Sequence, residues 1–135
     1  MAKTTGEIIQ VIGPVIDVSF EESGEELPSI YEALEIERPD GQILIIECQQ
    51  HTGEHTVRTI AMDSTDGLQR GMKVVATGES IKMPKGDTVK GRLLNVVGQA
   101  IDGIGPVDNS DGYQVHNQPP NTRIFPQNLR CFLLV

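Results

Sequence analysis

The stretch VIGPVIDVSF, residues 11–20, decides how the first part of this chain folds. Apolar and polar residues alternate from Ile16 to Phe20, and a period of two is typical of a strand with one buried face. The dipeptide Gly13-Pro14 interrupts the apolar residues and predicts a bend or a bulge there. This part of the chain therefore favours β-structure over helix.

Similar short apolar runs follow at close spacing. Residues 34–37 alternate again, Pro39-Asp40-Gly41 predicts a turn, and residues 42–49 read as the returning strand of a hairpin. Further strands are predicted over residues 56–62 and 72–76. Many short strands without a helix between them indicate a small closed antiparallel barrel from about Gly6 to Ser80, mainly β in class. Its expected core includes Ile16, Val18, Leu34, Ile36, Ile45, Val57, Ile60 and Val74.

The pattern changes after Pro84. Asp87-Thr88 offers an N-cap, and the apolar residues of 89–97 fall at helical spacing, so a short amphipathic helix is expected over Thr88–Val97. Gly98 stands where a C-terminal cap would be. Residues 101–111, rich in Gly and Asp, predict a hairpin with many turns. We place a boundary near residues 81–84, which separates residues 1–81 from residues 82–120; residues 121–135 are treated as a separate tail.

The bulk composition excludes some function classes. The formal net charge is −8 and aromatics make up only 4% of the residues, which argues against nucleic-acid binding. The first residues lead into no apolar segment, and no apolar run could span a bilayer, so we expect a cytoplasmic protein without a signal peptide. Cys48 and Cys131 fit no metal or disulfide pattern.

The histidines do not form a recognisable metal site. His51 and His55 are four residues apart, as on one face of a helix, but Gly53 and the β-rich flanks favour a polar hairpin loop instead. His116 stands alone and is expected at the surface.

The glycines and the clustered acidic residues are equally uninformative about chemistry. Gly98, Gly103 and Gly105 do not follow the dinucleotide-binding fingerprint, and no G-x-x-x-x-G-K-[ST] phosphate loop occurs. The acidic run favours a solvated loop; it contains Glu21, Glu22, Glu25 and Glu26. We therefore predict no catalytic, cofactor-binding or metal-binding residue in this chain.

Three stretches, in order, carry a resemblance to a known family. They are GEIIQVIGPVIDV (6–18), VRTIAM (57–62) followed by TDGL and RG, and GRLLNVVG (91–98) followed by Ile101-Asp102. Over about residues 6–120 the chain resembles the N-terminal part of the beta subunit of the F-type ATP synthase. The VRTIAM string favours the beta subunit over the alpha subunit, vacuolar-type subunits and secretion ATPases.

The resemblance implies a small N-terminal barrel followed by the incomplete start of an α/β nucleotide-binding domain. In the parent enzyme, this barrel packs in a ring of alternating alpha and beta subunits, in a catalytic head that is peripheral to the inner membrane. The parent couples ATP synthesis to proton transport and uses ATP, ADP and Mg²⁺. The family's catalytic residues lie downstream of this chain, so we expect it to be inactive alone and to hold no cofactor. Two alternatives stay open: a free-standing binding module, and a short regulator that docks on alpha subunits.

The last fifteen residues, 121–135, match nothing in the family. Read from the third base of the Asn121 codon, permitted codons give YEDLSTKLEVLFTG, which resembles the family's continuation. A lost base at this codon is therefore expected, with a genuinely divergent tail as the alternative. RCFLLV (130–135) has the composition of an aggregation-prone segment. We also expect the 88–97 helix to fray, because a helix this short is marginal in water.

Overall fold

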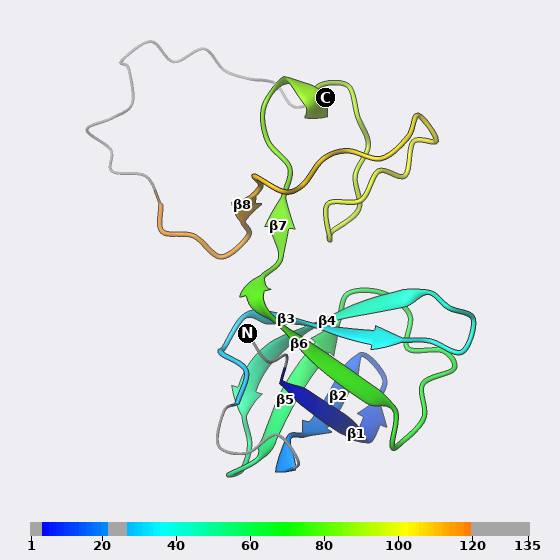
Figure 1. The fold of residues 1–135 in the computed structure, drawn as a ribbon, viewed down its shortest axis with the longest axis vertical. Coiled ribbons are helices and arrows are strands. Elements are labelled where there is room, and N and C mark those ends of the chain that lie inside the picture. Colours follow the sequence, from blue (N-terminus) through cyan, green and yellow to red (C-terminus); the bar gives the residue numbers. More distant parts are fainter. Residues whose placement is uncertain (1–3, 22–26, 120–135) are drawn as a thin grey trace.

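Six strands form a closed barrel in the computed structural model, which describes residues 4–21 and 27–119. Around the barrel the order is β1-β2-β5-β4-β3-β6, and each neighbouring pair is antiparallel (Figure 1). The strands are β1 (Thr5–Ile12), β2 (Val15–Ser19), β3 (Glu32–Glu37), β4 (Ile43–His51), β5 (Thr56–Ala61) and β6 (Lys73–Ser80). The predicted mainly-β class and the closed antiparallel barrel are confirmed.

The turns predicted from glycine join successive strands. Gly13 and Pro14 connect β1 to β2 as a two-residue turn, since Ile12 pairs with Val15 across it. Gly13 has φ of 57°, a left-handed conformation that a residue without Cβ adopts at little cost. The dipeptide is therefore a bend, and the bulge in this pair of strands lies earlier, between Ile8 and Gln10.

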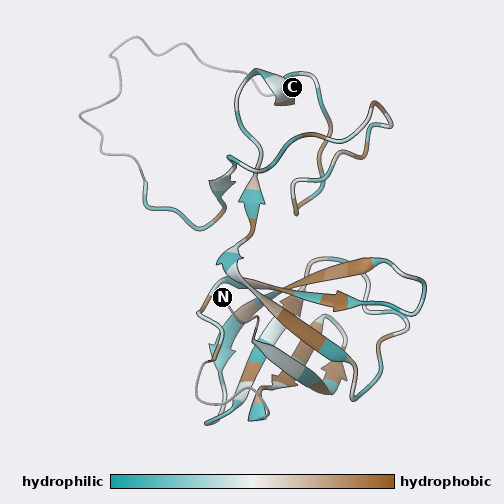
Figure 2. Ribbon diagram, in the orientation of Figure 1, coloured by the Kyte–Doolittle hydropathy of each residue, from teal (hydrophilic) through white to brown (hydrophobic). Residues whose placement is uncertain are grey.

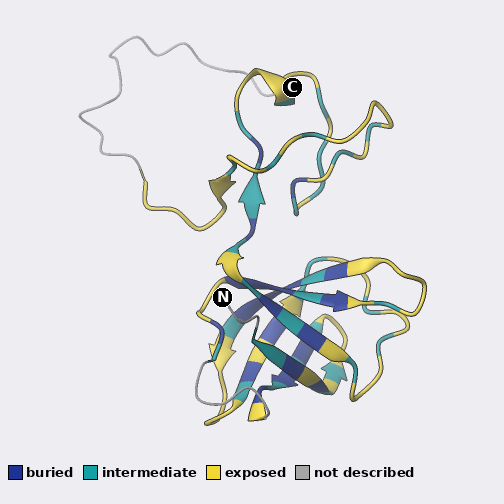
Figure 3. Cartoon of the chain, in the orientation of Figure 1, coloured by how far each residue is buried: buried dark blue, intermediate teal, exposed yellow. Residues whose placement is uncertain are grey.

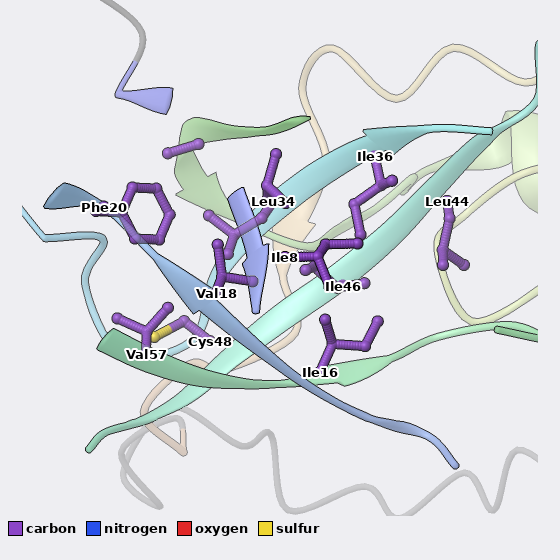
Figure 4. Close-up of a cluster of buried hydrophobic side chains, with 12 residues drawn as sticks. Ile8, Ile16, Val18, Phe20, Leu34, Ile36, Leu44, Ile46, Cys48 and Val57 are labelled. Atoms are coloured by element: carbon purple, nitrogen blue, oxygen red, sulfur yellow. The ribbon is translucent and has the colours of Figure 1, made fainter. Parts of the chain in front are cut away.

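The barrel is filled by aliphatic side chains from all six strands and by Phe20. Alternate residues point inward, and Figure 4 shows the cluster they form, with Ile16, Val18 and Leu34 among its members. Figures 2 and 3 show that buried and apolar positions are concentrated in the barrel strands. The core is continuous and leaves no open lumen, as expected for a small barrel. Its buried residues are Ile8, Ile16, Val18, Phe20, Leu34, Ile36, Leu44, Ile46, Cys48, Val57, Val74 and Ala76.

Two of the eight residues predicted for the core, Ile45 and Ile60, lie outside it. Ile45 is only half-buried, because its neighbours Leu44 and Ile46 take the inward positions of β4. Ile60 is 38% exposed, because Thr59 points inward on β5 and donates its hydroxyl to the Ile16 carbonyl at 2.8 Å. A one-residue change of parity moves a side chain to the opposite face of a sheet.

The chain beyond the barrel has little regular structure. It contains β7 (Lys82–Met83), which pairs with β8 (Tyr113–Gln114), the 3₁₀-helix η2 (Asp87–Val89), and an isolated bridge between Leu94 and Ala100. Figure 1 shows this part reached through the end of β6. The division at 81–84 stays a prediction, although β7 belongs to a separate sheet.

The predicted helix over Thr88–Val97 is wrong. Only the three residues of η2 are helical, and the chain then turns back on itself around Asn95. The Asn95 carboxamide oxygen accepts hydrogen bonds from the backbone nitrogens of Val97 (3.1 Å) and Gln99 (2.8 Å). Asn side chains that bond nearby backbone in this way compete with helix formation. Among residues 4–21 and 27–119 there is no α-helix, so the α/β start of a second domain stays a prediction.

No helix in the described part of the chain is long and apolar enough to cross a membrane.

Candidate functional site

The two histidines of the 51–55 segment have different surroundings. His51 is the last residue of β4 rather than part of a loop, and its Nε2 lies 2.8 Å from the Pro28 carbonyl oxygen. His55 is exposed in the β4–β5 turn. No group of three His, Cys, Asp or Glu side chains within residues 4–21 and 27–119 could hold a metal ion.

His116 lies at the surface, as predicted, but it does not stand alone. Its Nε2 lies 3.0 Å from Oε2 of Glu47 on β4, and its ring stacks on Tyr31 with centroids 4.0 Å apart and planes 18° apart. The Glu47 side chain is 7% exposed, and its other oxygen accepts a hydrogen bond from Gln49 at 2.5 Å. We call Tyr31, Glu47 and His116 the clasp, because they fasten residues 113–117 to the outer wall of the barrel.

The backbone around the clasp is correspondingly constrained. Tyr31 has φ of 70°, the one described residue other than glycine with a positive φ. A bulky side chain in this region is strained and persists only where its surroundings hold it. The backbone nitrogen of Tyr31 donates to the Cys48 carbonyl at 2.7 Å. In the segment that carries His116, the backbone nitrogen of Val115 donates to the Ile81 carbonyl at 2.9 Å. Nothing in the sequence signals this contact, since Glu47 and His116 are 69 residues apart.

A second polar anchor lies within the region beyond the barrel. Arg92 forms a two-bonded ion pair with Asp102, at 2.6 Å and 3.0 Å, and both side chains are largely buried. Asp102 also accepts bonds from the backbone nitrogens of Leu93 and Ile104. The hydrogen bonds from Arg92 hold the pKa of the Asp102 carboxyl well below its usual range. The pair therefore ties the two arms of the 92–105 loop together.

A groove of about 460 Å³ separates this loop from the barrel. Ile43, Ile45 and Met62 line it from the barrel side, and Val96 and Ile101 face them from the loop. Asp63, Asn95 and Gln99 add polar side chains to this lining. The groove therefore has a mixed polar and apolar lining.

The remaining sequence candidates have structural roles or lie outside the described residues. Gly98, Gly103 and Gly105 all have positive φ, and Gly98 and Gly103 lie in bends. A Cβ at Gly98 would come within 2.9 Å of the Lys82 carbonyl oxygen, so a larger residue does not fit there. Glu21 is exposed. Glu22, Glu25, Glu26 and the tail 121–135 lie outside the described residues.

Cys48 is buried in the core. Burial is the main cause that raises the pKa of its thiol to about 11, with the charge of Glu32 adding to the effect. A thiol in this setting is inert, because the thiolate is the reactive form. Cys131 lies outside the described residues.

The described residues form a filled barrel, and polar contacts join it to the segment that follows. The sequence model of the beta-barrel domain of the ATP synthase alpha/beta family matches residues 8–78. That range contains β2 to β5 entirely and most of β1 and β6. This protein belongs to the ATP synthase alpha/beta family.

Proposed function

We propose that this chain is the N-terminal part of a catalytic beta subunit of an F-type ATP synthase, and that its barrel packs beside alpha-subunit barrels in a ring. The observation that carries the proposal is the family match over a closed barrel. The VRTIAM string, residues 57–62, supports the beta subunit in particular; it forms β5 and continues one residue beyond it.

A packing role suits the chemistry of this barrel. Its interior is occupied by its own side chains, so it has no space for a ligand. Closure removes free strand edges, so a partner must be recognised through side chains of the outer wall. The acidic charge of the chain opposes the alternative of a module that binds oligonucleotides.

The chemistry of the parent enzyme is not assigned to this chain. Phosphoryl transfer depends on a positioned Mg²⁺ and a lysine at the phosphates, and no recognisable motif for either occurs in the sequence. In this proposal the chain assembles with other ATP synthase subunits in a complex peripheral to the membrane. It does not bind ATP tightly and does not hydrolyse it.

We also propose that the reading frame is shifted at Asn121. The support is that permitted codons for residues 121–135 can encode a family-like peptide in the neighbouring frame. Sequencing the gene past the Val135 codon tests this proposal directly. A phosphate loop of the G-x-x-x-x-G-K-[ST] type within a few dozen codons, in the shifted frame, is the expected result. An absence of any such frame would favour the short-regulator alternative.

Assembly is tested by co-expressing the tagged chain with alpha subunits. The expected result is a complex that survives affinity purification and size-exclusion chromatography. The purified chain alone should show no ATPase turnover. A chain that binds ATP with micromolar affinity, or that never associates with alpha subunits, would contradict the proposal. Binding to an oligonucleotide that weakens with added salt would favour the binding-module alternative.

A further inference from the structure

We propose that Asp66-Gly67, in the connection between β5 and β6, is a site of spontaneous covalent modification, where the folded chain converts an aspartyl linkage to an isoaspartyl linkage. The chemistry needs only water and belongs to the chain itself, so it is independent of the proposed function. The sequence contains four Asp-Gly steps, and the structure favours one of them. The four begin at Asp40, Asp66, Asp102 and Asp111.

The reaction is an attack of a backbone nitrogen on the preceding side chain. The nitrogen of Gly67 forms a bond to Cγ of the protonated Asp66 carboxyl, and one carboxyl oxygen leaves as water with the carboxyl proton and the amide proton. Glycine permits this approach because it has no Cβ and the freest backbone. The product is a cyclic imide. When water adds to the former main-chain carbonyl carbon of Asp66, the C–N bond at that carbon breaks, and the main chain then runs through Cβ and Cγ.

Asp66 and Gly67 are the central residues of an exposed turn. The backbone nitrogen of Leu68 donates to the Thr65 carbonyl oxygen at 3.2 Å across them, and Gly67 has φ of 81°. Within the described residues the Gly67 nitrogen donates no hydrogen bond, and a Cβ at Gly67 would meet no atom within 4 Å. The attacking nitrogen is therefore unprotected and has space around it.

The Asp66 carboxylate is also weakly held. It accepts a hydrogen bond from the Ser64 hydroxyl at 2.7 Å, and it forms no ion pair with another described residue. A carboxylate without a cationic partner can take up a proton and rotate toward the glycine nitrogen without first breaking an ion pair. Both reacting groups of this step are therefore available in the folded chain.

Asp102 is the opposite case. Its carboxylate accepts two bonds from Arg92, at 2.6 Å and 3.0 Å, and further bonds from the backbone nitrogens of Leu93 and Ile104. The bonds from Arg92 also hold the pKa of this carboxyl well below its usual range, which opposes the protonation that the attack requires. The carboxylate is therefore charged and fixed in place, so attack by the Gly103 nitrogen is suppressed.

At Asp40 the attacking nitrogen is engaged. The nitrogen of Gly41 donates to the Arg38 carbonyl oxygen at 2.9 Å. The Asp40 side chain in turn accepts a hydrogen bond from the backbone nitrogen of Gln42 at 3.0 Å. Both bonds must break before this step can react.

At Asp111 the nitrogen is engaged and the surroundings are crowded. The nitrogen of Gly112 donates to the Asn109 carbonyl oxygen at 3.2 Å, and the Asp111 carboxylate forms an ion pair with Lys85 at 3.0 Å. A Cβ at Gly112 would lie 2.7 Å from the Met83 carbonyl oxygen, so little room is left for a ring. Of the four steps, Asp66-Gly67 is the least protected.

The modified turn would affect two other connections of the barrel. Thr65 donates its hydroxyl to the carbonyl of Gly13 in the β1–β2 turn at 3.0 Å, and the Arg38 guanidinium donates to the Ser64 carbonyl. An isoaspartyl linkage at Asp66 lengthens the main chain by one methylene and leaves the carboxylate on a shorter branch. Both contacts should therefore loosen, while the core side chains on the strands stay packed.

The test incubates the full chain at neutral pH and follows its peptides over time by liquid chromatography and mass spectrometry. A protein-isoaspartate carboxyl methyltransferase with labelled S-adenosylmethionine identifies the isomer, whose mass is unchanged. In the folded chain, isoaspartate should accumulate at Asp66 about tenfold or more faster than at Asp102, whose carboxylate must first lose its charged hydrogen bonds. Asp66→Glu keeps the charge but would have to form a larger ring, so it should abolish the signal at this position.

Arg92→Gln is the matched control, because it releases the Asp102 carboxylate and leaves the turn at Asp66 unchanged. Isoaspartate should then appear at Asp102, while the rate at Asp66 stays within about twofold of wild type. In denaturing urea the four steps should react at similar rates, since no folded structure protects any of them. In the folded wild-type chain, equal rates at the four steps, or a faster rate at any step other than Asp66, would overturn the inference. So would the absence of isoaspartate at Asp66 under conditions in which the unfolded chain forms it.

Discussion

The barrel and the region beyond it, residues 82–119, are stabilised in different ways. In the barrel, every strand has two neighbours and the interior is aliphatic. In residues 82–119 the strands are two residues long, and five large apolar side chains are more than half exposed; these are Leu93, Val96, Ile101, Ile104 and Tyr113. Polar contacts hold this region together: the Arg92–Asp102 pair, the Asn95 turn and the clasp.

The difference indicates that the barrel folds by burying its own surface, whereas the second region depends on the barrel and on its polar contacts. Apolar burial stabilises by about 25 cal/mol per Å² and therefore needs side chains that are out of water. Residues 82–119 have few of these. Under the proposed function, their exposed apolar side chains are the surface that the remainder of a nucleotide-binding domain would cover.

The largest expected effect comes from the barrel core. Leu34→Ala should lower the free energy of unfolding by about 2–5 kcal/mol, because the side chain is fully buried and its removal leaves a cavity. Ile101→Ala, in the exposed loop, should change it by about 0.5 kcal/mol or less. Chemical denaturation followed by circular dichroism measures both. Equal effects at the two sites would show that the contrast between the regions is wrong.

The clasp should have a smaller effect. His116→Ala removes both the stacking on Tyr31 and a hydrogen-bonding partner of the buried Glu47 carboxylate, at an expected cost of about 1–3 kcal/mol to the docking of residues 113–117. Hydrogen exchange should speed up at Val115 and in β7 while the barrel amides stay protected. His55→Ala is the matched control, since His55 is exposed in a turn. Uniform acceleration through the barrel would contradict a local role.

The Arg92–Asp102 pair should act only on the loop around it. The pKa of Asp102 is lowered in the folded state. The stabilisation of the loop by the Asp102 carboxylate is therefore complete above the pKa of the unfolded chain, about 4. It is lost as the pH falls through the lower, folded value. The amide chemical shifts of residues 92–105 should therefore keep their native values to below pH 4 and change at lower pH, where Asp102 is protonated. Asp102→Asn should abolish this change of the shifts with pH. A barrel unfolding midpoint that also moved in Asp102→Asn would contradict the separation of the two regions.

The smallest effect is a difference in thiol reactivity between the regions. In Cys131→Ser, the buried Cys48 should not react with a thiol reagent at pH 7–8 until the barrel opens, because its pKa is raised to about 11. A cysteine introduced as Ile101→Cys, with Cys48→Ser and Cys131→Ser, should react at once. Mass spectrometry over time measures both. Fast labelling of Cys48 in the native chain would mean that the barrel opens locally.

Local sequence patterns predict the barrel and six of the twelve residues of its buried core. Alternation from Ile16 to Phe20 marks an inward and an outward face, and a glycine marks each tight turn. These signals are local, because side-chain direction in a strand depends only on the parity of the position. The run Ile43–Ile46 is apolar at every position, so parity could not be read there, and Ile45 was assigned to the wrong face.

Other features of the structure depend on contacts between residues distant in the chain. Helical spacing over 88–97 is present in the sequence, but Asn95 and the Arg92–Asp102 pair stabilise a turn instead, and Asp102 lies beyond any local window. The clasp joins residues far apart in the chain, since Glu47 and His116 are 69 residues apart. Contacts of this kind follow from how the sheet closes, which local patterns do not specify.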